Sequence, residues 1–243
     1  MFREASQNRI FQDVVEQIQD AILDGRLNKG DTLPPERDLK EMFNTSRGTL
    51  REALRVLEER GLIEIKLGVR GGARVQKVSS RHASATLALL IRSRRVALNH
   101  LAEFREGMEG SVASLAAQRA TDDDLEKLNQ LLAEATRCVE QGYAGRRAFW
   151  DVDRRFHREL ARISGNPVYQ LVLRSVHDNI HRYYDRYLSA DAAELGENLE
   201  DMSEMVRAVA EGRADTARLL AQSHVLRFVR RMKAREARNG SVE

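Results

Sequence analysis

The chain opens with three segments in which apolar residues recur every three or four positions. The first runs over residues 8–24 and the third over residues 47–60, and in each the apolar side chains fall on one stripe of a helix. Between them, Pro34 and Pro35 predict the start of a second helix, because proline suits the first helical turn. The buried positions expected of this second helix are Leu39, Met42 and Phe43.

The pattern then changes from helical spacing to alternation. Residues 62–67 and 73–78 alternate apolar and polar side chains, as half-buried strands do, and a glycine-rich tip over residues 68–72 separates them. Helix, helix, turn, helix and a two-stranded hairpin follow one another in the order of a winged helix-turn-helix. We therefore predict a DNA-binding domain of this kind over residues 1–78.

Beyond a polar linker expected at residues 79–84, only helical periodicity remains. The pattern predicts an all-helical domain over residues 85–237, which we expect to bind an effector and to dimerise, followed by a disordered tail over 238–243. The fold class is thus mainly α, with the hairpin wing as its small β component. The expected helices cover residues 85–92, 97–120, 122–141, 147–164, 167–189 and 193–237, the last with a break at Gly212.

Composition narrows the function classes only slightly. The 243 residues are 42% hydrophobic, which suffices for packed cores, and the net charge of +3 permits a nucleic-acid partner without implying one. Cys138 is the single cysteine, so an intramolecular disulfide and a cysteine-based zinc site are excluded. Because no apolar run is long enough to cross a bilayer and no signal peptide is recognisable, we expect no membrane partner and a cytoplasmic protein.

The placement of basic residues carries the nucleic-acid argument. Arg47, Arg51 and Arg55 lie four apart and therefore share the face of the third helix opposite its leucine stripe. Small hydroxyl donors at Thr45, Ser46 and Thr49 surround the start of that helix, and Arg70 stands at the wing tip. A merely solvated helix face would explain the three helical arginines, but it would not explain why basic residues also mark the tip. We interpret the set as a DNA-binding surface, in which arginine reads guanine or clamps phosphate.

The same segment resembles the N-terminal domain of the GntR family of bacterial regulators. The resemblance rests on residues 34–39 (PPERDL), 46–54 (SRGTLREAL) and 57–62 (LEERGL), which occur in order and at the right spacing. In the FadR-like branch of that family, the resemblance implies DNA contacts from Arg37, Arg47, Thr49, Arg51 and the wing glycine Gly68. Gly48 replaces a hydroxyl residue of some relatives, and the wing is slightly longer.

The helical half resembles the FCD effector domain of the same branch. The matching residues are 104–109 (FREGME), 115–117 (LAA), 153–157 (DRRFH), Gly165 with Asn166, and the terminal run 217–224. The resemblance implies a helical bundle that dimerises and binds a small organic acid or an acyl-CoA thioester.

Asp153 and His157 are a candidate metal pair. They lie four apart on one helix, so their side chains share a face and can hold one divalent ion, although a structural salt bridge has the same spacing. The resemblance adds His224 as a third ligand for zinc, nickel or manganese, but Met202 stands where metal-binding relatives have another histidine. Three alternatives follow: water or an effector carboxylate completes the site, His177 or His181 substitutes for the missing ligand, or the pocket holds no metal.

Arg105, Glu109 and Tyr183 are candidate effector-binding residues. Arg105 and Glu109 are one helical turn apart, and the resemblance implies that the arginine pairs with an effector carboxylate. An ordinary intrahelical ion pair is the alternative. Tyr183 belongs to a tyrosine cluster with Tyr184 and Tyr187 that lines either the cavity or the core.

Together these patterns predict a ligand-responsive DNA-binding transcription regulator that is not an enzyme. The family's commonest pattern is a repressor that its carboxylate or acyl-CoA effector releases from operator DNA. We expect a homodimer, because one winged helix contacts too few bases for useful specificity. A metal-dependent hydrolase fused to a DNA-binding module is the alternative, but the sequence lacks a catalytic glutamate beside the histidines. A structural nucleoid protein would need no enclosed polar cavity.

Overall fold

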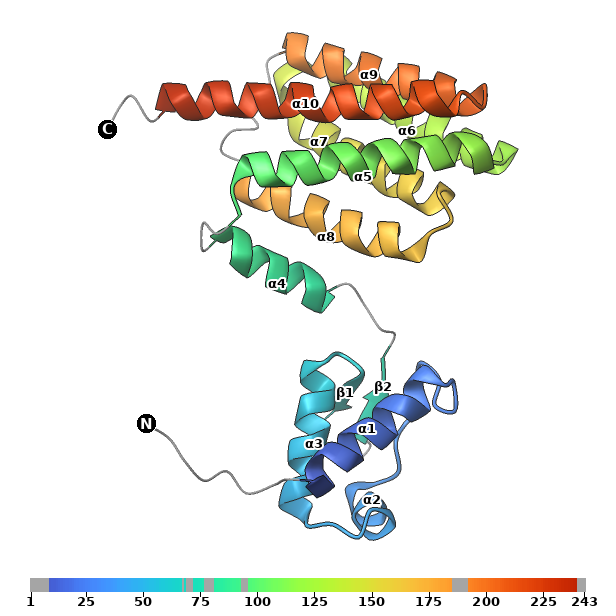
Figure 1. The fold of residues 1–243 in the computed structure, drawn as a ribbon, viewed down its shortest axis with the longest axis vertical. Helices are drawn as coiled ribbons and strands as arrows, with labels where there is room; N and C mark the ends of the chain where they lie inside the picture. The colour runs from blue at the N-terminus through green and yellow to red at the C-terminus, as the bar shows by residue number, and fades with distance from the viewer. Residues whose placement is uncertain are drawn as a thin grey trace. The chain divides into compact units, whose positions relative to one another are not determined.

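A computed structural model describes residues 9–66, 68, 72–76, 81–92, 96–184 and 192–239 (Figure 1). The chain divides into two compact units, Met1–His82 and Ala83–Glu243. Each unit has its own hydrophobic core.

The N-terminal unit is a winged helix-turn-helix, as the sequence predicts. It consists of α1 (Arg9–Leu23), α2 (Glu36–Met42), α3 (Arg47–Glu59), β1 (Ile63–Lys66) and β2 (Gly72–Val75). The strands pair antiparallel, with Ile63 opposite Val75 and Lys66 opposite Gly72. An isolated bridge between Thr32 and Arg74 ties the loop that precedes α2 to the wing.

Local chemistry sets the ends of α3. The Ser46 hydroxyl oxygen accepts a hydrogen bond from the Thr49 backbone N–H at 3.1 Å, which satisfies one of the free donors of the first turn. At the other end Gly61 adopts a φ of +70°, which lets the chain turn directly into β1. The buried face of the helix consists of Leu50, Ala53, Leu54 and Leu57.

Three sequence expectations need correction at their edges. Met42 is expected from its spacing to be buried, but it is 71% exposed. Helix α2 has only seven residues, and the side chain that it buries is that of Leu39. Helix α4 (Arg81–Arg92) begins inside the expected linker, since residues 81–84 contain neither glycine nor proline to stop a helix. Helix α10 (Ala214–Asn239) likewise continues two residues into the expected tail.

The C-terminal unit is a helical bundle. After α4 it contains α5 (Leu98–Arg119), α6 (Asp122–Glu140), a short 3₁₀ turn (Gly142–Gly145), α7 (Arg146–Ile163), α8 (Pro167–Tyr184), α9 (Ala192–Ala210) and α10. Helices α5 and α10 lie side by side over much of their length, and α9 packs against both (Figure 1). The predicted break at Gly212, whose φ is +67°, separates α9 from α10.

Two local features of this bundle are a capping box that the sequence predicts and a close contact between two helices. The Thr121 hydroxyl accepts from the Asp124 backbone N–H at 3.3 Å, and the Asp124 carboxylate accepts from the Thr121 backbone N–H at 3.1 Å, which forms a reciprocal capping box for α6. On α5, a Cβ at Gly110 would lie 2.8 Å from Cγ of Gln222 on α10, so a larger residue there requires the Gln222 side chain to shift. Within the described residues, no helix combines the length and the apolar character that a membrane span requires.

Candidate DNA-binding face and candidate metal centre

The exposed face of α3 carries the predicted arginines. Arg47, Arg51 and Arg55 all point away from the buried leucine stripe and are exposed. The helix therefore presents three guanidinium groups along one side, and its N-terminal end carries Arg47. This is the end of a recognition helix that meets base edges in the major groove.

Two arginines of the predicted set are held by acidic neighbours. Arg51 Nε donates to Glu36 Oε2 on α2 at 2.7 Å, and Arg37 Nε donates to Asp38 Oδ1 at 3.1 Å. The side chains are 64% and 78% exposed, and ion pairs at such positions contribute little to stability. Both guanidinium groups are therefore available to exchange a carboxylate for a phosphate.

The predicted hydroxyl donors do not all lie together. Ser46 and Thr49 meet at the start of α3, where their hydroxyl oxygens are 2.9 Å apart. Thr45, by contrast, is only 8% exposed and does not share their accessible position. The sequence offered no signal for this difference, because all three residues are small hydroxyl residues beside the same turn.

The wing is described only in part. Gly68 has a φ of +112°, a conformation that favours glycine, and no atom lies within 4 Å of where its Cβ would stand. Arg70 lies outside the described residues. Arg74 on β2 donates from Nε to the Gly30 carbonyl oxygen at 2.9 Å, so this arginine supports the loop before α2.

A buried polar cluster lies within the C-terminal unit. It combines side chains from five helices, and each of them is less than a tenth exposed. The members are Arg105 and Glu109 on α5, Asp153 and His157 on α7, His177 on α8, Asp201 on α9 and His224 on α10. Buried ionisable groups in such number require one another as partners, so the cluster acts as one electrostatic unit.

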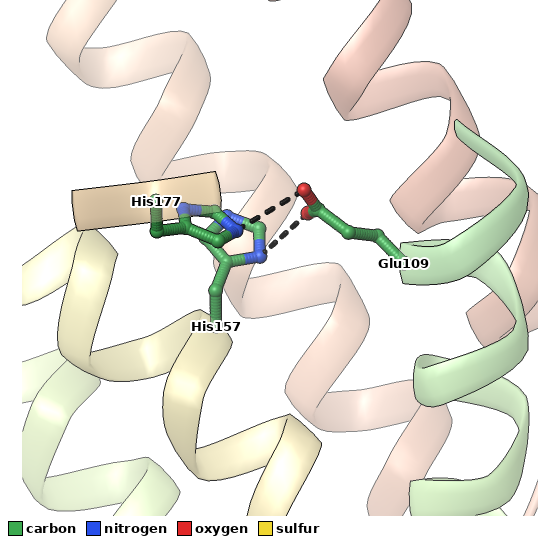
Figure 2. A group of neighbouring side chains, drawn as sticks. All are labelled: Glu109, His157 and His177. Carbon is green, nitrogen blue, oxygen red and sulfur yellow. Dashed lines mark ion pairs between the residues drawn. The ribbon is translucent and has the colours of Figure 1, made fainter. Parts of the chain in front are cut away.

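Glu109 binds two histidines at once (Figure 2). Its Oε2 lies 2.8 Å from His157 Nδ1 and its Oε1 lies 3.2 Å from His177 Nε2. The two imidazole rings are stacked, with centroids 4.7 Å apart and planes at 24°. Arg105 Nε donates to the same Glu109 Oε1 at 2.5 Å, so the intrahelical ion pair, which is the alternative to an effector contact, forms inside the bundle. Glu109 Oε2 and His177 Nε2 are both fully buried and, among the described residues, make no hydrogen bond of good geometry, so these contacts are ion pairs.

The second ring nitrogen of His157, Nε2, faces the other two predicted metal ligands, Asp153 and His224. His157 Nε2 lies 3.6 Å from Asp153 Oδ1, and His224 Nε2 lies 3.9 Å from that same oxygen. One ligand atom from each of the three residues lies within 4.8 Å of the other two. His224 Nδ1 is hydrogen-bonded to Asp201 Oδ2 at 3.0 Å.

The electrostatics of the cluster follow from burial and from its neighbours. Burial raises the pKa of Glu109, but Arg105, His157 and His177 outweigh it and hold that pKa well below the usual range. Burial lowers the pKa of His157, but Glu109 and Asp153 outweigh it and raise it to about 10. Burial, with Arg105 and His157 nearby, lowers the pKa of His177 to about 4 despite Glu109. At neutral pH the stacked pair therefore contains one charged and one neutral imidazole.

The set of Asp153, His157 and His224 fits a divalent metal. Two ligand atoms about 2.0 Å from one tetrahedral ion stand roughly 3.3 Å apart, which is close to the observed separations of 3.6 and 3.9 Å. Among the described residues, His157 Nε2 is fully buried and makes no hydrogen bond of good geometry. Imidazole nitrogen and carboxylate oxygen suit zinc, nickel and manganese. Bound there, such an ion would supply a positive charge and open positions for an anionic ligand.

The remaining predicted residues fall outside this set. His177 groups with Glu109 and His157, in a second set whose ligand atoms all lie within 4.8 Å of one another, rather than with Asp153 and His224. Met202 is fully buried in the apolar core. The side chains of Tyr183 and His181 lie outside the described residues. Asp201 is the functional candidate that sequence reasoning missed, since a single aspartate on an amphipathic helix gives no signal of its own.

The fold and the cluster define a class: winged helix-turn-helix proteins that carry a second, all-helical unit. Comparison of the sequence with known protein families identifies one family within that class. Residues 11–75 match the family described as bacterial regulatory proteins, gntR family, and residues 100–227 match the FCD domain. The chain therefore belongs to the GntR family, in the branch with a C-terminal FCD domain, and the resemblance found in the sequence is confirmed.

Curated relatives agree with this assignment. The HTH-type transcriptional repressor NanR of Cronobacter sakazakii is 32% identical to this chain over 173 residues, and so is NanR of Escherichia coli K12. The match covers 70% of this chain and 64% of each relative, so it spans slightly less than two thirds of the length of those proteins. The family and these relatives are regulators rather than enzymes, and the hydrolase alternative finds no support.

Solved structures share the fold. The Streptococcus agalactiae GntR structure superposes with a TM-score of 0.70 at 26% identity, and the match covers 90% of this chain and 99% of that one. Escherichia coli McbR/YncC superposes with a TM-score of 0.50 at 19% identity, with 93% of this chain and 98% of that chain covered. The second likeness concerns the fold alone.

Proposed function

We propose that this protein is a ligand-responsive, sequence-specific DNA-binding transcription regulator that acts in the cytoplasm. The observation that carries the proposal is the exposed arginine face of α3, positioned by a capped turn within a winged helix-turn-helix. The NanR relatives are named as transcriptional repressors, which supports repression as the mode of action. The proposed DNA contacts are Arg37, Ser46, Arg47, Thr49, Arg51, Gly68 and Arg70.

We further propose that the helical unit senses a small carboxylate or an acyl-CoA through a metal-assisted site. Asp153, His157 and His224 would hold one divalent ion, and a carboxylate oxygen of the effector would occupy an open coordination position. Glu109 contacts the proposed ligand His157 and is paired with Arg105. Arg105, Glu109 and Tyr183 are the proposed effector contacts. Effector binding would then change the affinity of the dimer for its operator.

The DNA-binding proposal is tested by comparing two arginines of α3 that we expect to act differently. Arg47→Ala should weaken binding to the preferred DNA by about 1–3 kcal/mol and relax sequence preference, as the loss of a base contact does. Arg51→Ala should weaken binding to all sequences alike and reduce the slope of log affinity against log salt by about one. Fluorescence anisotropy with labelled duplexes at several salt concentrations measures both effects.

A matched control is Arg26→Ala. Arg26 is equally exposed and also paired with an acid, Asp24, but it lies in the loop after α1 rather than on α3. Its replacement should leave affinity and salt slope close to wild type. If Arg47→Ala behaves like Arg26→Ala, α3 is not the recognition helix.

A further inference from the structure

Two of the proposed metal ligands share an arrangement that extends beyond the ligand atoms. His157 and His224 each have Nε2 toward Asp153, at 3.6 and 3.9 Å. Each has Nδ1 toward a different, second carboxylate: Glu109 at 2.8 Å and Asp201 at 3.0 Å. All of these side chains are less than a tenth exposed, so water does not compete for either nitrogen.

This arrangement has a chemical consequence for the two imidazoles. A neutral imidazole carries its proton on one nitrogen and a lone pair on the other, and a carboxylate that accepts from one nitrogen determines which is which. Once a metal ion displaces the proton on Nε2 of His157, Glu109 would keep the remaining proton on Nδ1 of that ring, and Asp201 would do the same for His224. Both Nε2 atoms, which lie near Asp153, would then be free to bind the ion.

We infer that Glu109 and Asp201 are positioning residues of the metal centre, each of which orients one histidine ligand and fixes its tautomer. The inference rests on the proposed metal site at Asp153, His157 and His224. Carboxylates in this role typically raise metal affinity by about 10–100-fold, because they align the ring and increase its basicity.

Each positioning carboxylate is itself held by an arginine. Arg105 donates to Glu109 Oε1 and leaves Oε2 for His157. Arg227 pairs with Asp201 Oδ1 at 3.0 Å and leaves Oδ2 for His224. The same construction, arginine to carboxylate to imidazole, thus occurs twice around the centre.

The inference also assigns a role to α9. Met202 on this helix lies in the apolar core, and a thioether is a poor ligand for zinc, nickel or manganese. Asp201, the preceding residue, reaches His224 instead. Helix α9 therefore acts on the centre through His224 rather than through a ligand of its own.

The test measures zinc affinity of the full-length chain by competition with a coloured chelator. Asp201→Ala should weaken zinc binding by about 10–100-fold, and Asp201→Asn should recover part of the loss, because an amide oxygen still accepts from Nδ1–H. The matched control is Glu197→Gln. Glu197 also links α9 to α10, through Arg231, but it is half exposed and does not belong to the cluster.

A second measurement separates positioning from a general effect on folding. In the zinc-loaded wild type, long-range ¹H–¹⁵N spectra of ¹⁵N-histidine-labelled protein should show His157 and His224 protonated at Nδ1 and bound through Nε2. Asp201→Asn should alter the His224 signals and leave those of His157 in place.

The outcomes distinguish the two proposals. A wild type that binds no zinc overturns the metal site and the inference with it. A wild type that binds zinc, with Asp201→Ala equal to Glu197→Gln or with His224 bound through Nδ1, overturns the inference alone.

Discussion

His157 is the residue on which both halves of the buried cluster depend. Its Nδ1 faces Glu109 and its Nε2 faces Asp153, and these two carboxylates outweigh burial in raising its pKa to about 10. In the metal-free protein at neutral pH the ring is therefore protonated on both nitrogens. A metal ion that binds Nε2 must displace one proton.

Zinc affinity should consequently rise with pH. Since the pKa of His157 in the folded, metal-free protein is about 10, each pH unit from about 6.5 to 8.5 should raise the apparent affinity about tenfold, as expected for the displacement of one proton. Chelator competition at several pH values measures the slope. Glu109→Gln removes a carboxylate that raises this pKa and should flatten the profile, whereas Glu103→Gln on the same helix should not. A flat wild-type profile would contradict a protonated His157.

Met202 supplies a second prediction at this scale. Met202→His restores the histidine that metal-binding relatives carry, so zinc or nickel affinity should increase by at least about tenfold, since a fourth suitable ligand is added. Met202→Leu is the control, because it keeps an apolar side chain of similar volume in the core. Elemental analysis and chelator competition provide the measurement. If Met202→His binds zinc and nickel no more tightly than Met202→Leu does, residue 202 does not face the proposed ion.

Sequence reasoning reached only part of this site. Asp153 and His157 were predictable because a spacing of four places both on one helix face, and the family resemblance added His224. Asp201 and the stacking of His177 on His157 depend on how α8 and α9 pack against α7 and α10, which no local spacing encodes. The burial of Thr45 similarly depends on tertiary packing.

At the scale of elements, most helices were predictable from apolar periodicity and from their caps. The Thr121 to Asp124 capping run, the Gly212 break and the hairpin all form as the pattern indicates. Errors occurred where the sequence contains no stop signal, as at the start of α4, or where an element is too short for its period to show, as in α2 with its exposed Met42. Helix ends are generally the least determined part of such patterns.

Helix α5 offers a matched pair of glycines. No atom lies within 4 Å of the place that a Cβ at Gly107 would take, so Gly107→Ala should stabilise the protein by roughly 0.5–1 kcal/mol through helix propensity. A Cβ at Gly110 would lie 2.8 Å from Gln222 Cγ and 3.3 Å from Arg218 Cγ, so Gly110→Ala should cost about 1–3 kcal/mol from overpacking, which outweighs the same gain. Urea denaturation measures both changes. Equal stabilisation by both substitutions would mean that α5 and α10 are not held this closely.

At the scale of the whole molecule, the proposal requires two recognition helices acting together. One winged helix reads too few base pairs for useful specificity, so we expect a homodimer bound to a pseudo-palindrome with half-sites related by two-fold symmetry. The family membership of both units is consistent with an arrangement in which the FCD domain responds to ligand and the winged helix to DNA.

The most direct measurement is the selection of DNA by the full-length protein from a random pool, followed by anisotropy on selected and scrambled duplexes. The expected result is a two-fold symmetric motif, bound at least about 10³-fold more tightly than scrambled DNA and by two chains per duplex in sedimentation. Arg47→Ala should lose that preference. Recovery of no common motif, with equal affinity for selected and scrambled DNA, would contradict a sequence-specific regulator.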